Sequence, residues 1–409
     1  MKTKHLIVIG GGASGIFCAV NSAAMSNHLE VTVLEKTHRL LSKVEVSGGG
    51  RCNVTHDCDD IDEMSTCYPR GRHFVKKAFH EFFTTDTLTW FRERGVQIVS
   101  EADGRMFPST NTSSTIIRCL LREAEQHGVS MRLRTEVTGI TKTSDGFRVI
   151  LNDGSELLSD FVFIACGGLQ NSSAFKWIEA TGHEIVSPVP SLFTFNLPGN
   201  PISALMGISV PEAFIRIEGS KFRSQGPLLI THWGLSGPAI LRLSAIAARE
   251  LNESNYHFKI IVDWLPTFSR EEILATIGLQ RRERGGQLLH SKSLFGLPGR
   301  LWQFMSETVR IMPESRWADL PSAKQSALVD LLKGQVFEVR GKTTFKEEFV
   351  TAGGVSTRQV DPSSMQSRLV EGLYFGGEVL DVDGITGGYN FQHAWSSGWI
   401  AARHISARV

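Results

Sequence analysis

The chain has 409 residues, enough for two or three domains. Its 43 Lys and Arg nearly balance its 42 Asp and Glu, so it lacks the charge excess of a polycationic nucleic-acid-binding protein, although a local basic face would fit this balance. No apolar run is long enough to span a bilayer. Six scattered cysteines without paired metal-ligand spacing predict reduced thiols in a cytoplasmic protein.

The N-terminal stretch predicts a strand, a glycine loop, a helix and a second strand. Residues 6–9 form a continuous apolar run typical of a buried parallel strand, and they lead directly into glycines, unlike a leader peptide. A small-residue helix is expected from Ile16 to about Met25, and a second strand over residues 31–34. The loop between the first strand and the helix reads Gly10-Gly-Gly-Ala-Ser-Gly15.

This loop has the spacing of a dinucleotide-binding fingerprint, in the strand–loop–helix context that the fingerprint requires. Gly10 is expected to make the tight turn, Gly12 to let a pyrophosphate approach the backbone, and Gly15 to let helix and strand pack closely. Glu35, which ends the second strand, lies where an acid would accept hydrogen bonds from a ribose. The cofactor contacts predicted here are Gly10, Gly12, Ala13, Ser14, Gly15, Glu35 and Lys36.

A second glycine motif follows, Ser47-Gly-Gly-Gly-Arg-Cys-Asn53. Consecutive flexible backbone N–H groups can form a concavity that binds an anion, which favours a cofactor-contacting loop over an ordinary surface loop. Arg51 could lie beside a carbonyl or phosphate, and Asn53 could bond the edge of a heterocycle. The predicted contacts are Lys43, Ser47, Gly48, Gly49, Gly50, Arg51, Cys52 and Asn53.

The next hundred residues predict two helices and a small meander. Apolar spacing favours amphipathic helices over residues 74–83 and 116–124. Asp-Gly turns separate three predicted strands over residues 137–140, 147–151 and 156–158. The basic residues near the first helix are a candidate phosphate-backbone contact, although such a cluster is more often a solvated face: Arg70, Arg72, His73, Lys76 and Lys77.

A strand over residues 161–164 then meets Ala165-Cys-Gly-Gly168, a second place where the backbone can approach a cofactor. Cys166 is interpreted as a small buried filler, since no other cysteine lies near it in sequence. The predicted cofactor contacts of this part are Val137, Cys166, Gly167 and Gly168.

From about residue 190 to 345 the pattern changes to short strands and then to helices. The segments 192–196, 214–218, 228–231 and 258–262 are β-like. His232 and Trp233 begin a loop that enters a helix with Pro238 near its first turn. The helical part carries two predicted capping boxes, at Ser269 and at Ser322, and is locally basic. Without a cofactor motif, this region is expected to bind the substrate.

The C-terminal stretch predicts a short strand over residues 373–375, a glycine-rich loop with acids, and a helix that begins near Gly388. Glycines before a helix let a ligand approach the exposed N–H groups at the positive end of the helix dipole. The predicted contacts are Gly377, Glu378, Asp381, Gly387, Gly388, Tyr389, Asn390 and Phe391.

These motifs together resemble a bacterial flavoprotein family that includes aminoacetone-oxidase-like proteins, bile-acid-reductase-like (BaiN-type) proteins and ribosomal RNA dihydrouridine synthases. The resemblance spans the whole chain, and its most specific parts are Ser47–Asn53 and residues 387–390. The chain departs from the usual family pattern at Cys166, where Thr is common, and at Trp233, where Arg is frequent.

The resemblance implies an α/β fold: a Rossmann-like FAD-binding domain of the glutathione-reductase type, with an inserted β-barrel-like domain and a small helical lobe. The expected boundaries are residues 1–189 with 346–409 for FAD binding, 190–268 with about 335–345 for the β-rich substrate domain, and 269–334 for the lobe. FAD is the implied cofactor, with NADH or NADPH as transient electron donor.

The implied activity is reduction of an activated C=C bond, best matched by uridine to dihydrouridine in large-subunit ribosomal RNA. Arg51, Arg105 and Trp233 are the candidate substrate contacts, and Cys52 or His232 the candidate proton donor, although a packed thiol and a structural histidine are the commoner roles. Expected partners are ribosomal RNA or a ribosome precursor, otherwise a small molecule, and no membrane. Two alternatives stay open: a flavin oxidase of a small amine, and a flavin-containing assembly factor without turnover.

Overall fold

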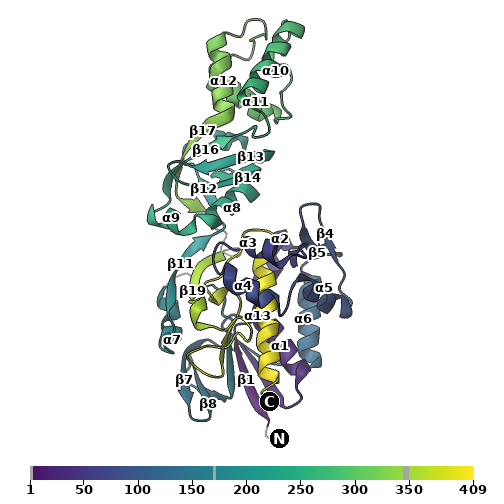
Figure 1. Cartoon of the computed structure of the whole chain (residues 1–409), viewed down its shortest axis with the longest axis vertical. Helices are drawn as coiled ribbons and strands as arrows, with labels where there is room; N and C mark the ends of the chain where they lie inside the picture. The colour runs from purple at the N-terminus through teal and green to yellow at the C-terminus, as the bar shows by residue number, and fades with distance from the viewer. Residues whose placement is uncertain (1–2, 169–171, 344–349) are drawn as a thin grey trace. The chain divides into compact units, whose positions relative to one another are not determined.

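The computed structural model describes residues 3–168, 172–343 and 350–409 and divides into two compact units (Figure 1). The first unit comprises Met1–Ser191 and Phe345–Val409, and the second comprises Leu192–Thr344. Each unit buries its own hydrophobic cluster. Within the described ranges, no helix is both long and apolar enough to cross a membrane.

The first unit is built on a five-stranded parallel sheet in the order β20-β10-β1-β2-β6. Its two central strands are almost fully buried, as expected of a parallel sheet covered by helices on both faces. The strands are β1 (Lys4–Ile9), β2 (Leu29–Glu35), β6 (Ser130–Leu133), β10 (Phe161–Ile164) and β20 (Leu373–Phe375). The predicted strands over residues 6–9, 31–34, 161–164 and 373–375 are therefore confirmed, and so is the α/β fold class.

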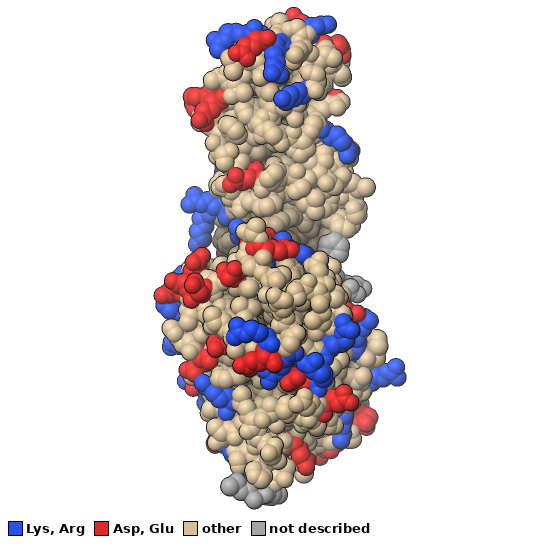
Figure 2. Space-filling view, turned by 90° about the vertical axis from the view of Figure 1, so that its right-hand side faces the viewer, with Lys and Arg blue, Asp and Glu red and all other residues tan. Residues whose placement is uncertain are grey.

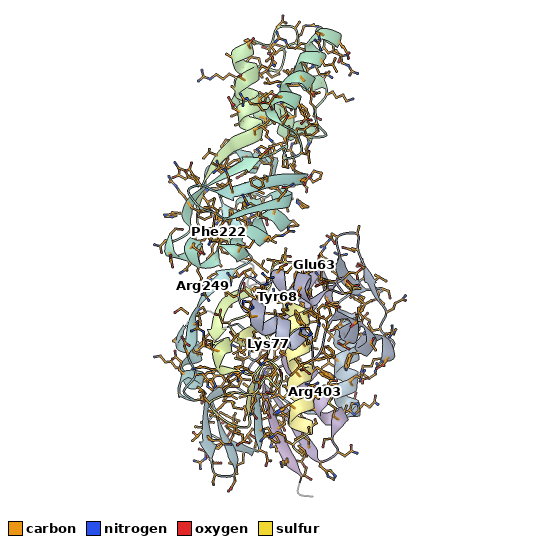
Figure 3. The ribbon with its side chains drawn as sticks, in the orientation of Figure 1. Glu63, Tyr68, Lys77, Phe222, Arg249 and Arg403 are labelled. Carbon is orange, nitrogen blue, oxygen red and sulfur yellow. The ribbon has the colours of Figure 1, made fainter. Side chains whose placement is uncertain are left out.

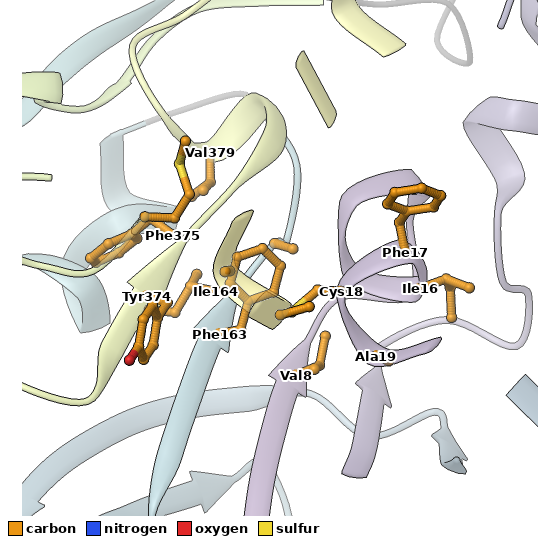
Figure 4. Packing of buried hydrophobic residues seen from close by; sticks show 14 of the residues in the cluster. Val8, Ile16, Phe17, Cys18, Ala19, Phe163, Ile164, Tyr374, Phe375 and Val379 are labelled. Atoms are coloured by element: carbon orange, nitrogen blue, oxygen red, sulfur yellow. The ribbon is translucent and has the colours of Figure 1, made fainter. Parts of the chain in front are cut away.

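Two helices from opposite ends of the chain, α1 (Ala13–Met25) and α13 (Tyr389–Ser406), pack side by side (Figure 1). The contact is tight at Gly398, where a Cβ atom would lie only 2.7 Å from the Ser14 carbonyl oxygen. Ile16 and Phe17 of α1 belong to the same buried hydrophobic cluster as Val8 and Phe163 of the sheet (Figure 4). Burial of this layer is the main source of the unit's stability.

Smaller antiparallel sheets extend the first unit. The predicted meander is present as β7 (Val137–Thr143), β8 (Gly146–Leu151) and β9 (Glu156–Ser159). A second small sheet joins β3 (Thr55–His56), β5 (Arg105–Pro108) and β4 (Ile98–Ser100), and a two-stranded sheet joins β11 (Ile185–Ser191) to β19 (Val350–Val355).

The helices between β2 and β6 differ in part from the prediction. The single helix expected over residues 74–83 is wrong: α4 (Arg72–Phe79) ends early, and the Asp86 carboxylate accepts a hydrogen bond from the Phe83 N–H (2.7 Å) to start α5 (Thr84–Glu93). The remaining helices here are α2 (Ser42–Gly50), α3 (Ile61–Thr66) and α6 (Ser114–Gln126), with the short α7 (Lys176–Glu179) after β10.

The second unit contains a seven-stranded sheet in the order β17-β16-β13-β14-β15-β12-β18, so that β17 and β18 are its edge strands. Every pairing in this sheet is antiparallel. The strands are β12 (Thr194–Asn196), β13 (Ser209–Ile217), β14 (Arg223–Ile230), β15 (Gly234–Ser236), β16 (His257–Asp263), β17 (Gln335–Arg340) and β18 (Lys342–Thr343).

The helices of the second unit share one hydrophobic cluster with this sheet. Pro238 is the first residue of α8, as predicted, and the Ser269 capping box is confirmed because its hydroxyl accepts from the Glu272 N–H. The box predicted at Ser322 is wrong, since that residue already lies inside the helix. The helices are α8 (Pro238–Ile246), α9 (Ala248–Glu253), α10 (Arg270–Glu283), α11 (Gly299–Thr308) and α12 (Ser322–Gly334).

A buried ion pair ties the segment before α4 to the C-terminal loop of the first unit. The Arg70 guanidinium holds both carboxylate oxygens of Asp383, which has no exposed surface, and the Ser191 hydroxyl donates to the same carboxylate (2.9 Å). Burial raises the pKa of the Asp383 carboxyl, while Arg70 and Ser191 act in the opposite direction. The carboxylate therefore depends on these two donors to remain charged inside the protein.

Arg70→Met should lower the free energy of unfolding by about 3–5 kcal/mol, because it leaves a buried charge without its partner. Adding Asp383→Leu should recover most of that loss, since the double variant no longer buries a charge. Urea unfolding of the single and double variants measures the difference.

The half-exposed pair Arg148–Glu156 is the matched control, and its loss should cost less than about 1 kcal/mol. A single variant Arg70→Met as stable as the wild type would show that the buried pair has no structural role.

Candidate cofactor site

The first glycine loop has the geometry that a dinucleotide needs. Gly10 has a φ of +111°, and a Cβ there would lie 2.3 Å from the Ala165 carbonyl oxygen. A Cβ at Gly15 would lie 1.9 Å from the Gly10 carbonyl oxygen, so helix and strand can meet only without a side chain. At Gly12, by contrast, an added Cβ meets nothing within 4 Å. The first two glycines are required by the protein itself, whereas Gly12 leaves room for a ligand.

The N-terminus of α1 is available to an anion. Gly12 is its N-cap, no side chain caps the helix, and Ala13 and Ser14 form its first turn. The free N–H groups at the positive end of the helix dipole can therefore bind a phosphate that lies above Gly12.

Glu35 is held in place at the end of β2. Its carboxylate oxygens accept hydrogen bonds from the Gly11 and Thr37 N–H groups, each at 2.8 Å. Each oxygen keeps a second acceptor site, so the side chain can still bind a ribose hydroxyl. The neighbouring Lys36 is exposed.

The triple-glycine motif forms a left-handed bend inside α2. Gly48, Gly49 and Gly50 have φ angles of +58°, +69° and +83°, which glycine adopts without steric cost. Ser47 has an extended conformation, and its hydroxyl donates to the Val44 carbonyl at 2.9 Å. An added Cβ at Gly49 or Gly50 would meet nothing within 4 Å, so this bend, like Gly12, borders open space.

Cys52 and Asn53 turn inward after the bend. Cys52 is fully buried, and burial raises the pKa of its thiol to about 12, with the Ser47 contact acting the other way. The thiol lies in the hydrophobic cluster of the first unit, which argues against the prediction that it protonates a substrate. Asn53 accepts a hydrogen bond from the Met106 N–H at 3.2 Å and lies next to Gly388.

The structure brings the two candidate substrate arginines together. Arg51 and Arg105 both bind the Glu101 carboxylate, at 2.7 and 2.9 Å, and the Arg51 guanidinium lies 3.9 Å from the centroid of the Phe107 ring. Arg105 also pairs with Asp103 at 2.8 Å. Both charges are compensated within the protein, so any anion bound here would have to compete with two acids.

A second group of polar residues surrounds Glu378. Its carboxylate pairs with Lys43 at 2.6 Å and accepts from the Thr351 N–H at 2.9 Å. A Cβ at Gly168 would lie 2.6 Å from the same carboxylate and 2.4 Å from the Thr351 hydroxyl. That hydroxyl is buried and has no hydrogen-bond partner among the residues that the structure describes, so it remains available to a ligand.

The N-terminus of α13 is also uncapped by a side chain. Gly387 and Gly388 have φ angles of +138° and +95° and lead directly into Tyr389, the first helical residue. Asn390 fixes the loop by exchanging hydrogen bonds with the backbone of Gly384, at 2.8 and 3.0 Å. A long helix without a side-chain cap thus begins here, and the positive end of its dipole favours an electron-rich ligand edge.

Aromatic side chains support the same turn. The Tyr389 ring stacks on His56, with 4.7 Å between ring centroids. The Tyr389 carbonyl accepts a hydrogen bond at 2.6 Å from the hydroxyl of Tyr68, which is labelled in Figure 3. Phe391 stacks on Trp395 one turn further along the helix. Neither His56 nor Tyr68 stands out in the sequence, because each acts through a partner more than 300 residues away.

The remaining predicted contacts lie at the margins of this region. Cys166 and Gly167 follow β10 and are half-buried, and burial raises the pKa of the Cys166 thiol to about 12. Val137 is buried at the start of β7, and the half-buried Asp381 donates its N–H to Val355 at 2.9 Å.

His232 and Trp233 belong to the second unit. Their ring centroids lie 3.6 Å apart, with His232 exposed and Trp233 half-buried. Both residues line a cleft of the second unit.

The basic cluster predicted near α4 needs one correction. Arg70 is not part of a solvated face, because its guanidinium forms a buried ion pair with Asp383. Lys76 pairs with Asp62, whereas Arg72, His73 and Lys77 are exposed.

His393 is a buried residue that the sequence did not mark. It has 2% exposure, and its Nε2 lies 3.3 Å from the Gly377 carbonyl oxygen, while its Nδ1 has no hydrogen-bond partner among the described residues. Burial lowers its pKa to about 4. The imidazole is therefore neutral at pH 7, directly behind the loop that carries Glu378.

These residues fit FAD. Open space above Gly12 and an uncapped helix suit a pyrophosphate, and Glu35 suits the adenosine ribose. The unpartnered Thr351 hydroxyl suits a polar chain such as ribityl, and the α13 N-terminus suits the electron-rich edge of a flavin. When bound, FAD supplies two-electron redox chemistry, which these side chains do not provide.

Comparison with known proteins identifies the family of the chain. Residues 4–404 match the family described as HI0933-like protein Rossmann domain. The chain belongs to this family, whose fold and flavoprotein relatives mark it as an FAD-dependent oxidoreductase.

Two relatives match along their whole length. A 3-dehydro-bile acid delta(4,6)-reductase of Clostridium scindens is 28% identical over 98% of each chain. A ribosomal RNA dihydrouridine synthase of Escherichia coli is 31% identical over 100% of this chain and 99% of the relative.

Among solved structures, a 3-ketosteroid delta1-dehydrogenase of Sterolibacterium denitrificans superposes with a TM-score of 0.53 at 13% identity, covering 100% of both chains. At this identity the likeness concerns the fold alone. The resemblance predicted from the motifs is confirmed by the family match.

Gly12→Ala should leave the fold intact and weaken FAD binding, because the new methyl group meets no protein atom and fills the space proposed for the pyrophosphate. The flavin-free protein should keep its stability within about 0.5 kcal/mol. Its dissociation constant for FAD should rise at least about tenfold, measured by the fluorescence of free flavin.

Gly15→Ala is the contrasting variant, because its methyl group collides with the backbone and should destabilise the protein even without flavin. Wild-type FAD affinity in the variant Gly12→Ala would place the pyrophosphate elsewhere.

His393→Phe should make stability less sensitive to acid. Between pH 6.5 and 4 the unfolded chain binds a proton at this residue that the folded protein does not, so the free energy of unfolding falls as pH falls. The substitution should reduce this slope by up to about 1.4 kcal/mol per pH unit, measured by urea unfolding with saturating FAD.

His183 remains in the variant, and burial lowers its pKa to about 4, so part of the acid sensitivity should persist. The exposed residue His73, replaced by Phe, is the control and should keep the wild-type slope. An unchanged slope in the variant His393→Phe would mean that the folded protein protonates this imidazole.

Proposed function

We propose that the protein is an FAD-dependent reductase of a C=C bond conjugated to a carbonyl group. The observation that carries the proposal is the end-to-end match to two relatives, one named a reductase and the other a dihydrouridine synthase, combined with a site whose glycines and helix ends suit FAD. Dihydrouridine is uridine with its conjugated C=C bond saturated. The name of the second relative therefore also implies reduction of a C=C bond.

Uridine in large-subunit ribosomal RNA is our best candidate substrate. The second unit carries 18 Lys and Arg against 13 Asp and Glu, a net charge of +5, which leaves the rest of the chain at −4. Figure 2 shows Lys and Arg side chains gathered at the helical end of this unit, with a few acids among them. A local positive excess favours a polyanionic partner, and a target uridine would have to be presented unpaired.

NADH or NADPH is the proposed electron donor. A hydride adds to one carbon of the substrate double bond, and a proton adds to the other. The N-terminus of α13 favours a cofactor edge that carries negative charge, and His393, neutral behind Gly377, adds no charge of its own to this effect. For the proton, exposed His232 or water is a better source than Cys52, whose thiol is buried.

Deleting the gene should remove a dihydrouridine from large-subunit ribosomal RNA, measured by mass spectrometry of nucleosides from the purified RNA. A plasmid copy of the wild-type gene should restore the nucleoside, and a copy carrying Gly12→Ala should not. Unchanged RNA in the deletion strain would overturn the proposed substrate.

Anaerobic mixing of the purified flavoprotein with NADH or NADPH serves as the companion experiment. Bleaching of the flavin by one of them is expected. Peroxide formation from a small amine without either nucleotide would instead indicate an oxidase, and a flavin that neither nucleotide reduces would indicate a protein without turnover.

A further inference from the structure

The second unit contains a cleft that lies outside the cofactor motifs. Its volume is about 470 Å³, and its lining includes Asn196, Asn200, His232, Trp233 and Arg340. This volume falls within the range of about 300–1,000 Å³ typical of small-molecule sites. All the lining residues belong to the second unit, so the cleft is complete within it.

A tight turn presents the two aromatic residues of the cleft. Thr231 and Gly234 exchange backbone hydrogen bonds at 2.8 and 3.3 Å, which places His232 and Trp233 at the tip between them. Gly234 has a φ of +153°, and a Cβ there would lie 2.1 Å from the Phe195 carbonyl oxygen. The Trp233 carbonyl accepts from the Leu197 N–H at 2.8 Å, which anchors the turn against the opposite wall. The aromatic pair is therefore fixed before any ligand arrives.

The two asparagine side chains of the cleft can donate hydrogen bonds to a ligand. Asn200 uses its Oδ1 to accept from the Ile202 N–H at 3.0 Å, and Asn196 uses its Oδ1 to accept from the Thr343 hydroxyl at 2.9 Å. Within the part of the chain that the structure describes, neither NH₂ group donates a hydrogen bond, so each can donate one to a ligand. A ligand that matches these two side chains must offer hydrogen-bond acceptors, such as the carbonyl oxygens of a pyrimidine.

Arg340 adds a replaceable positive charge at the end of β17. It pairs with Glu338 at 3.0 Å, with 60% and 58% of the two side chains exposed. Ion pairs this exposed are weak, so a phosphate can displace the carboxylate. The guanidinium fork is well suited to phosphate oxygens.

We propose that this cleft binds a pyrimidine nucleotide, with the base against the His232–Trp233 pair, its carbonyl oxygens on Asn196 and Asn200, and its phosphate on Arg340. The nucleotide is either free in solution or part of a single-stranded RNA, since both offer the same base and phosphate. The inference rests on the proposed function only in choosing RNA as one of the two sources.

Binding is tested with full-length, FAD-loaded protein and three probes: UMP, uridine and a fluorescein-labelled single-stranded oligouridylate. UMP should bind more tightly than uridine in calorimetric titration. Trp233→Ala should weaken binding of UMP and oligonucleotide by about 5- to 150-fold, the range that loss of one stacking contact produces. Trp233→Phe should recover part of this loss.

Arg340→Gln should weaken the binding of UMP and leave the affinity for uridine unchanged. The variant should therefore lose the preference for the nucleotide that carries a phosphate. Arg216→Gln is the matched control, because Arg216 is exposed on β13 of the same unit and does not line the cleft. Circular dichroism checks that each variant is folded.

Saturable binding of UMP that depends on Trp233 supports a free-nucleotide site, and binding of the oligonucleotide alone with the same dependence supports an internal RNA nucleotide. The inference is overturned if neither UMP nor the oligonucleotide binds, or if the wild type and all cleft variants bind them with equal affinity. These titrations need no turnover. Unchanged ribosomal RNA in the deletion strain would therefore overturn the proposed substrate of the enzyme without changing the binding result.

Discussion

The close contact between α1 and α13 is the constraint on which the cofactor site depends. Gly398 lets the two helices approach until a side chain would collide with the Ser14 carbonyl. At the preceding residue, the Ser397 hydroxyl lies 3.2 Å from the Ser14 hydroxyl and accepts from the Gly377 N–H at 2.9 Å. These contacts bring the first glycine loop and the C-terminal loop together, although more than 360 residues separate them. Any larger residue at Gly398 would force the two loops apart.

The site that results is organised around the N-termini of two helices rather than around charged side chains. The N-termini of α1 and α13 lack side-chain caps, and the glycines beside them leave space for a ligand. The arginines nearby are already paired with acids. This distribution suits a large cofactor held along its length by many neutral hydrogen bonds. The second unit has the opposite character, with a positive net charge and a cleft lined by partly exposed aromatic and amide groups.

Local rules made much of this predictable from the sequence. Gly10 and Gly15 have the tight turn and the close packing expected from their spacing, because these properties depend on the immediate neighbours, and Gly12 borders open space. Long-range pairings were not visible: Arg70 looked like part of a basic face, and nothing in the sequence linked it to Asp383, 313 residues away. His393 was missed for the same reason, since its burial comes from tertiary packing. The predicted helix over residues 74–83 is too long, because Phe82 and Phe83 fit the helical spacing. In the structure the Asp86 carboxylate caps a new helix, α5, at this point.

The central claim is that both ends of the chain build one flavin site. A crystal structure of the flavin-bearing protein tests it most directly. The account predicts one FAD per chain, with its pyrophosphate above Gly12, its ribose hydroxyls on Glu35, and the pyrimidine edge of the flavin at the first-turn N–H groups of α13. Density for FAD that contacts only the N-terminal glycine loop, or protein that crystallises without flavin after saturation with FAD, would contradict the claim.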